Sequence, residues 1–193
     1  MKREYEGSRH TKETQIDLSL NFDTAQYKIN TSVGFLDHML ELFAHHGNFG
    51  LKISAKGDTH IDYHHLVEDI GILLGQAFYH AAGDKKGIKR YGYMVLPMDE
   101  VLMECVIDFG GRTYFSYDVT FSTQKCGDFD MELIEEFFRA FTNNAKINLH
   151  LNMKKGGNSH HIAEAAFKAC ARALKEALTI ESNKLMSTKG IIE

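Results

Sequence analysis

The chain has 193 residues, of which 44% are hydrophobic and 25% charged, so it is long enough for one globular domain or for two small halves that share a core. A formal net charge of −4 excludes a general attraction to nucleic acid or to an anionic membrane, so any bound anion must be held by local groups. The first residues lack the apolar core of a secretory signal, and no stretch approaches the about 18 apolar residues of a membrane span.

The first half of the chain alternates between strand and helix patterns. Apolar residues at every second position over 14–22 predict a strand. Residues 35–46 carry apolar groups at helical spacing and are followed by Gly47, which is typical of a helix with a glycine C-cap. An alternating run over 49–55 predicts another strand, and a polar connection then leads into a helix from about 63 to 82.

The second half repeats this order. Two strand-like runs lie within 92–109, and a further alternating segment covers 113–121. Residues 131–142 are predicted to form a helix and residues 146–153 a strand. The last predicted helix, 159–178, is rich in alanine and leucine, which favour helices.

The two halves can be aligned with each other. The residue pairs that match at a spacing of 98 positions are Phe43 with Phe141, Leu51 with Leu149, and Ile53 with Leu151. We interpret this as an internal duplication of a β-β-α-β-α-like unit. The predicted fold class is therefore α+β, with antiparallel sheets packed on helices. We expect a single catalytic domain over 1–193, with halves of about 1–90 and 91–193.

A His-His-x-x-Glu motif occurs at matching places in the two halves. The first copy is His64, His65 and Glu68, and the second is His160, His161 and Glu164. The first histidine and the glutamate share a helix face, whereas the second histidine points about 100° away. Because neighbouring imidazole rings diverge, this arrangement favours two ions, or ions held between motifs.

The chemistry of these donors favours Mn, Fe or Zn, since imidazole and carboxylate are present without thiolate. A single motif of this kind is also interpretable as the polar start of a surface helix, but two copies favour a metal site. The three cysteines form no CxxC pair, which is unlike a disulfide framework or a thiolate site and favours a reducing, cytoplasmic location.

The duplication indicates two further candidate metal ligands, one before each motif. His38 lies 26 residues before His64, and Glu136 lies 24 residues before His160, so the two positions are equivalent. Glu136 is also interpretable as a solvated helix carboxylate.

Basic and hydroxyl residues near the ends of the predicted elements suggest an anion pocket. A guanidinium binds phosphate oxygens through two parallel hydrogen bonds, and lysine and serine add a point charge and a short donor. Each residue alone is also interpretable as an ordinary solvated side chain. The candidates are Arg90, Arg112, Lys168, Ser187 and Lys189.

Eight blocks that span nearly the whole chain in order resemble the imidazoleglycerol-phosphate dehydratase family. They are RHTKET at 9–14, GFLDHML at 34–40, DYHHLVED at 62–69, LPMDE at 96–100, DFGGRTY at 108–114, EEFFRAF at 135–141, GNSHHIAEAAFKACARAL at 157–174 and STKG at 187–190. The resemblance implies a lyase of histidine biosynthesis that dehydrates imidazoleglycerol phosphate to imidazole acetol phosphate. It also implies a duplicated fold like domain 2 of ribosomal protein S5, two Mn²⁺ ions per active site, and a cage of 24 subunits with active sites between neighbours.

The resemblance assigns roles to individual residues. The metal ligands it implies are His38, His64, His65, Glu68, His160, His161 and Glu164, with Glu136 at a position where some relatives have histidine. The phosphate pocket it implies is Arg90, Arg112, Lys168, Ser187 and Lys189, and the other substrate contacts are Glu13 and His46.

This dehydration removes a proton that is not beside a carbonyl, so the imidazole ring is the available electron source. Two Lewis-acidic ions, one on each ring nitrogen, would favour an imidazolate, whose electrons expel the hydroxyl to give a diazafulvene-like intermediate. A carboxylic acid must protonate the leaving hydroxyl and a base must take the proton. Glu13 is the first candidate for this work, with Glu68 or Glu164 as alternatives.

Two other functions use the same features. A dinuclear metal-dependent phosphatase would use the ions and the basic pocket to release inorganic phosphate. A non-catalytic metal-dependent assembly module would use the histidines to join subunits.

Overall fold

The computed structural model describes residues 2–190 and 192 and contains two equivalent halves. The first half forms β1 (Glu4–His10), β2 (Thr14–Asn21), β3 (Tyr27–Asn30), α1 (Gly34–Gly47), β4 (Gly50–Gly57) and α2 (His64–Ala81). The second half forms β5 (Tyr91–Met98), β6 (Val101–Asp108), β7 (Tyr114–Asp118), the small hairpin β8 (Lys125–Cys126) and β9 (Phe129–Asp130), α3 (Leu133–Ala145), β10 (Asn148–Lys155) and α4 (Ser159–Ala177).

The two four-stranded sheets have the same topology. Their orders are β1-β2-β4-β3 and β5-β6-β10-β7. In each sheet the first three strands in this order pair antiparallel, and the last strand runs parallel to its neighbour. The predicted α+β fold with duplicated halves is therefore confirmed.

The main sheet of each half has four strands, one more than the predicted β-β-α-β-α unit. Of the strands observed in the first half, β1 and β3 were not predicted along the chain, whereas β7 of the second half is the segment predicted at 113–121. In β1, half-buried and exposed residues alternate without a fully buried position, because it is an edge strand. Its partner β2 shows the usual alternation of a sheet with one covered face. The strand β3 has only 4 residues, too few to show a period.

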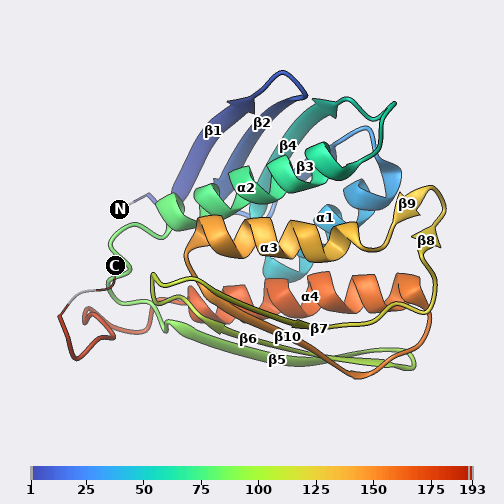
Figure 1. Cartoon of the computed structure of the whole chain (residues 1–193). Coiled ribbons are helices and arrows are strands. Elements are labelled where there is room, and N and C mark those ends of the chain that lie inside the picture. Colours follow the sequence, from blue (N-terminus) through green and yellow to red (C-terminus); the bar gives the residue numbers. More distant parts are fainter. Residues whose placement is uncertain (1, 191, 193) are drawn as a thin grey trace.

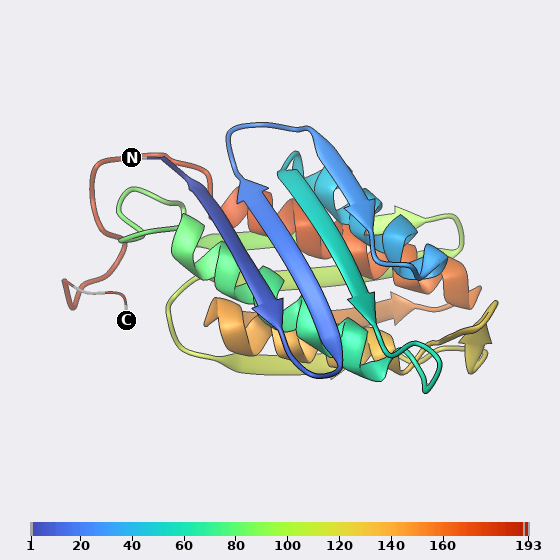
Figure 2. The same cartoon turned by 90° about the horizontal axis from the view of Figure 1, so that it is seen from above.

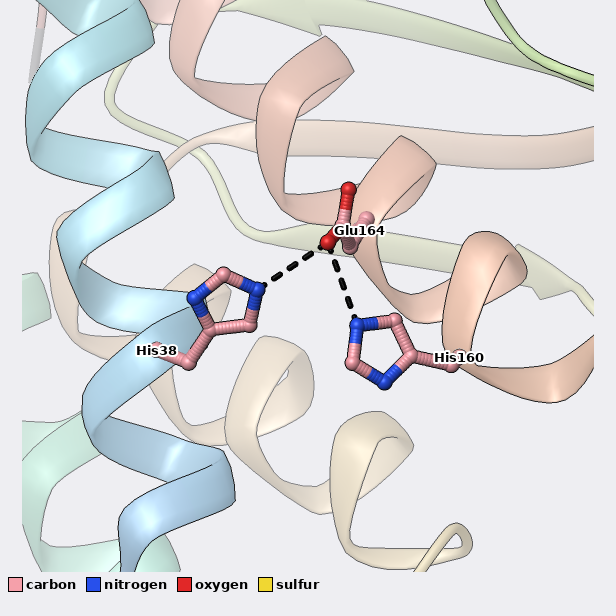
Figure 3. A group of neighbouring side chains, drawn as sticks. All are labelled: His38, His160 and Glu164. Atoms are coloured by element: carbon pink, nitrogen blue, oxygen red, sulfur yellow. Dashed lines mark hydrogen bonds and ion pairs between the residues drawn. The ribbon is translucent and has the colours of Figure 1, made fainter.

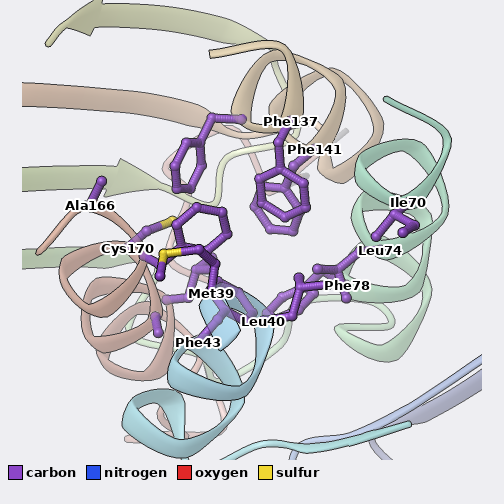
Figure 4. Close-up of a cluster of buried hydrophobic side chains, with 14 of the residues drawn as sticks. Met39, Leu40, Phe43, Ile70, Leu74, Phe78, Phe137, Phe141, Ala166 and Cys170 are labelled. Carbon is purple, nitrogen blue, oxygen red and sulfur yellow. The ribbon is translucent and has the colours of Figure 1, made fainter. Parts of the chain in front are cut away.

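The sheets form the outer layers, and the helices lie between them (Figures 1 and 2). Helix α2 packs on β1 and β2, and α4 packs on β5 and β6. Between the halves, α2 contacts α3 and α1 contacts α4. Buried side chains from both halves form one continuous core, and Figure 4 shows Phe43 and Phe78 of the first half close to Phe137 and Phe141 of the second.

Two glycines let α2 and α3 approach closely. A Cβ added at Gly71 would lie 2.8 Å from the carbonyl oxygen of Phe137, and one at Gly75 would overlap the carbonyl oxygen of Phe141. The backbones of these helices therefore touch where other residues would hold them apart.

The N-terminal ends of α2 and α4 lie at the same end of the molecule, beside the β8–β9 hairpin (Figure 1). The segment that follows α4 lies at the opposite end. This arrangement puts both His-His-x-x-Glu motifs at one end of the helical layer. Over the residues that the structure describes, no helix is both long and apolar enough to cross a membrane.

Candidate active site

Three predicted metal ligands converge between α1 and α4. The Nε2 atom of His38 lies 3.0 Å from Oε1 of Glu164, and Nε2 of His160 lies 3.1 Å from the same oxygen (Figure 3). Asn158 caps α4 by accepting a hydrogen bond of 2.8 Å from the backbone N–H of His160. The helix thus begins where its first turn presents His160 and Glu164 to His38. All three ligand atoms lie within 4.8 Å of one another.

The carboxylate of Glu164 is held in its ionised form. Burial would raise the pKa of Glu164, but hydrogen bonds from Lys168 and His38, aided by His160, override this effect and lower the pKa to about 2. Lys168 lies one turn further along α4 and donates to Oε2, the second carboxylate oxygen. A buried anion between two imidazoles is a suitable environment for a cation.

His46 lies on α1 near the same cluster. Burial lowers the pKa of His46, and the nearby charge of Lys168 lowers it further. The contact region between α1 and α4 therefore carries three predicted metal ligands and also two residues predicted to bind substrate, His46 and Lys168.

His161 points away from this cluster, as its position in the motif predicts. Its ring is turned 87° from that of His160. Its Nδ1 lies 3.0 Å from Oε2 of Glu100, and Oδ2 of Asp99 lies 3.9 Å from its Nε2. The hydrogen bond with Glu100 raises the pKa of His161. Glu100 was not among the residues predicted for the site, although it lies in the LPMDE block.

In the first half, His65 occupies the place equivalent to His161. Its Nδ1 lies 3.0 Å from Oδ2 of Asp58 and 3.9 Å from Oε2 of Glu13. The hydrogen bond with Asp58 raises the pKa of His65. The ring of His64 is turned 88° from that of His65, so the two histidines of this motif also diverge.

The remaining predicted ligands are not assembled within one chain. Among the described residues, His64, His65, Glu68 and Glu136 join no group of three clustered ligand atoms. The carboxylate of Glu136 on α3 lies 3.6 Å from Nε of Arg139. Helices α2 and α3 nevertheless pack together, as α4 and α1 do. The helix that carries Glu68 is therefore equivalent to the one that carries Glu164, and the helix of Glu136 is equivalent to that of His38.

The donor set fits a divalent metal ion such as Mn²⁺, Fe²⁺ or Zn²⁺. Two imidazole nitrogens and one carboxylate oxygen converge without thiolate. His38 and His160 approach the same oxygen, Oε1 of Glu164, so the three ligand atoms already lie around a common point.

Four of the five predicted phosphate ligands line a separate surface pocket of about 240 Å³. They are Arg90, Arg112, Ser187 and Lys189. The guanidinium of Arg90 donates to both carboxylate oxygens of Asp108, at 2.7 and 3.0 Å, and to the carbonyl oxygen of Met186 at 2.7 Å. The hydrogen bond with Asp108 raises the pKa of Arg90. The fifth predicted residue, Lys168, is instead bonded to Glu164.

Comparisons with known proteins identify one family. The family model described as "Imidazoleglycerol-phosphate dehydratase" matches residues 31–174. A curated protein of that name from Caldicellulosiruptor saccharolyticus is 52% identical to this chain, and the match covers 97% of both chains. Another from Geobacter sulfurreducens is 54% identical, and the match covers 98% of this chain and 99% of the relative.

Two solved structures with this description are also similar. The enzyme from Staphylococcus aureus subsp. aureus N315 is 46% identical with a TM-score of 0.85, and the match covers 92% of this chain and 99% of that chain. The enzyme from Pyrococcus furiosus, in complex with (S)-C348, is 34% identical with a TM-score of 0.84, over 96% of this chain and 99% of that chain.

Proposed function

The chain belongs to the imidazoleglycerol-phosphate dehydratase family, and on this premise we propose that it holds two Mn²⁺ ions in each active site. As a member, it is a hydro-lyase that converts imidazoleglycerol phosphate to imidazole acetol phosphate in histidine biosynthesis. The observation that carries the proposal is the convergence of His38 and His160 on Oε1 of Glu164.

The proposed ligands are those of the two motifs with His38 and Glu136. When bound, the ions would supply Lewis acidity to the substrate's imidazole and so favour negative charge on it. Lys168 keeps the Glu164 carboxylate ionised, which suits a ligand and makes Glu164 a poor proton donor. The role of Glu164 in proton transfer is therefore secondary in this proposal.

Glu13 is the residue best suited to move protons. Its side chain is 54% exposed, and the ion-pair partner of its carboxylate, among the described residues, is the Nδ1 atom of His65 at 3.9 Å. A loosely held carboxyl can protonate the leaving hydroxyl or accept a proton from carbon. Glu68 is half-buried and remains the alternative.

The active site is proposed to lie between copies of the chain. Arg90 follows α2, whereas His64 begins it, and a helix of 18 residues rises about 27 Å at 1.5 Å per residue. One small phosphorylated imidazole cannot reach both ends of such a helix. The phosphate pocket of one copy must then face the metal ligands of another, which supports a homo-oligomer, proposed as a 24-mer. The biosynthetic role supports a cytoplasmic location.

The proposal is tested by turnover of imidazoleglycerol phosphate with metal-stripped protein before and after Mn²⁺ is added. We expect imidazole acetol phosphate to appear only with the metal, without release of inorganic phosphate. Phosphate release would favour the dinuclear phosphatase instead. A protein that assembles with the metal but turns nothing over would favour an assembly module, and turnover without any metal would exclude the proposed metal centre.

A further inference from the structure

The duplication places Glu13 and Glu100 at equivalent positions. They are 87 positions apart, and the same spacing relates the buried Ile16 of β2 to Met103 of β6. Each glutamate immediately precedes its strand, and each carboxylate faces the second histidine of the motif in its own half. The distances nevertheless differ, at 3.9 Å for Glu13 to His65 and 3.0 Å for Glu100 to His161.

The difference has a local cause. In the first half, Asp58 follows β4 and takes the Nδ1 atom of His65 at 3.0 Å. The position 98 residues later, after β10, is Gly156, which has no side chain to do the same. In the second half Glu100 therefore makes the contact to Nδ1 that Asp58 makes in the first half, and Glu13 makes no hydrogen bond to the ring of His65.

Glu100 is fixed at both of its oxygens. Oε2 faces Nδ1 of His161, and Oε1 accepts a hydrogen bond of 2.6 Å from the backbone N–H of Asn158, the N-cap of α4. The backbone leaves room for this contact because residue 157 is a glycine, and a Cβ there would overlap the carboxylate. The turn between β5 and β6 is thereby tied to the start of the helix that carries the motif.

We propose that Glu100 is a positioning residue that accepts a hydrogen bond from Nδ1–H of His161 and so presents Nε2 of that ring as the ligand atom. A neutral imidazole carries one N–H, so a carboxylate at Nδ1 selects the tautomer whose Nε2 lone pair is free. A carboxylate that accepts the second ring N–H of a ligating histidine orients the ring and strengthens metal binding. Asp58 does the same for His65, which leaves Glu13 without a hydrogen bond to its histidine. This inference rests on the proposed manganese centre.

The first test is Mn²⁺ affinity of the full oligomer, measured by competition with a chelator. In Glu100→Gln one oxygen becomes an NH₂ group, which leaves only one acceptor for two donors. Gly157→Ala keeps the carboxylate but pushes it away from the ring. Both variants should bind the metal about 10- to 100-fold more weakly, since this is the usual loss when such a carboxylate partner is removed. Glu100→Asp should recover part of the affinity.

Glu176→Gln is the matched control. Glu176 likewise accepts one backbone N–H, from Tyr93 at 2.8 Å, and one side-chain donor, Lys89, but it lies near the far end of α4. This variant should bind Mn²⁺ like the wild type. Wild-type affinity in Glu100→Gln would overturn the proposed role of Glu100.

A second measurement does not depend on the metal. Crystals of the metal-free Glu100→Ala variant should show the His161 ring rotated or spread over several positions, while α4 keeps its place. An unchanged ring would overturn the inference even if the wild type binds manganese. If the wild type binds no manganese, the metal centre fails, and the ring orientation still decides whether Glu100 positions His161.

Discussion

At the scale of single residues, carboxylates that look alike in sequence have different surroundings. Glu164 is largely buried and bonded to two histidines and a lysine. Glu100 is bonded to a histidine and a helix N-terminus, and Glu13 is exposed beside His65. These surroundings suit the carboxylates to different roles, because a carboxylate held by several donors stays ionised while a loosely held one can exchange a proton.

Replacement of Glu13 by Gln is expected to lower kcat by about 10²- to 10⁴-fold, the usual contribution of an acid or base group. The metal content and the KM should change little, because the amide keeps the size of the side chain. Steady-state kinetics with metal analysis of the same sample measures both. Near-full activity would remove Glu13 from the mechanism and favour Glu68.

Replacement of Arg112 by Ala is expected to raise the KM about 10- to 100-fold with a small change in kcat, because a charge-assisted hydrogen bond to phosphate is lost. Among the described residues the guanidinium of Arg112 has no hydrogen bond or ion pair, so the fold should not suffer. Arg90→Ala is the contrasting variant, since it also leaves Asp108 without its partner and should lower the melting temperature. An unchanged KM in Arg112→Ala would exclude this pocket as the phosphate site.

At the scale of elements, the position of the motifs depends on how the helices pack. Helix α1 of the first half contacts α4 of the second, which brings His38 to residues more than 120 positions away. Helices α2 and α3 make the equivalent contact, with Gly71 and Gly75 in the seam. The close approach of these two backbones fixes where the first motif lies relative to α3.

Replacement of Gly71 by Ala is expected to destabilise the fold by about 1–3 kcal/mol, because overpacking a helix contact forces the backbones apart. Gly34→Ala at the start of α1 is the matched control, since its Cβ would meet no atom within 4 Å. Urea denaturation followed by circular dichroism, at equal chain concentrations, compares the two. Equal stability of both variants would contradict the importance of the α2–α3 contact.

At the scale of the whole molecule, the phosphate pocket and the metal motifs occupy opposite ends of the helical layer (Figure 1). A site that needs both is then incomplete in a single chain. Symmetric assembly brings different surfaces of identical copies together and can complete such a site.

This arrangement predicts complementation between two inactive variants. Arg112→Ala lacks a pocket residue and Glu164→Gln lacks a metal ligand, so each should be nearly inactive alone at low substrate. Oligomers reassembled from an equal mixture should regain roughly a quarter of the wild-type rate, because some sites then combine an intact pocket with intact ligands from different copies. No recovery from fully mixed oligomers would mean that each chain supplies its whole site.

The sequence by itself determined the features that depend on neighbouring residues in the chain. The helix predicted at 63–82 is observed as His64–Ala81, and the one at 159–178 as Ser159–Ala177. The divergence of paired histidines follows from the rotation of a helix per residue. The duplication was also visible, because apolar positions recur at a constant spacing in the two halves.

Only the tertiary structure decided which side chains meet. The edge strand β1 was missed because it has no fully buried position and therefore little apolar pattern, and β3 is too short to carry one. The bond of Lys168 to Glu164 follows from helix geometry, since the two are four residues apart, but only the fold shows that Lys168 lies outside the pocket of Arg90 and Arg112. The contact of Glu100 with His161 joins a turn to a helix 61 residues away. Local periodicity carries no information about such contacts, since they depend on how separate elements pack in space.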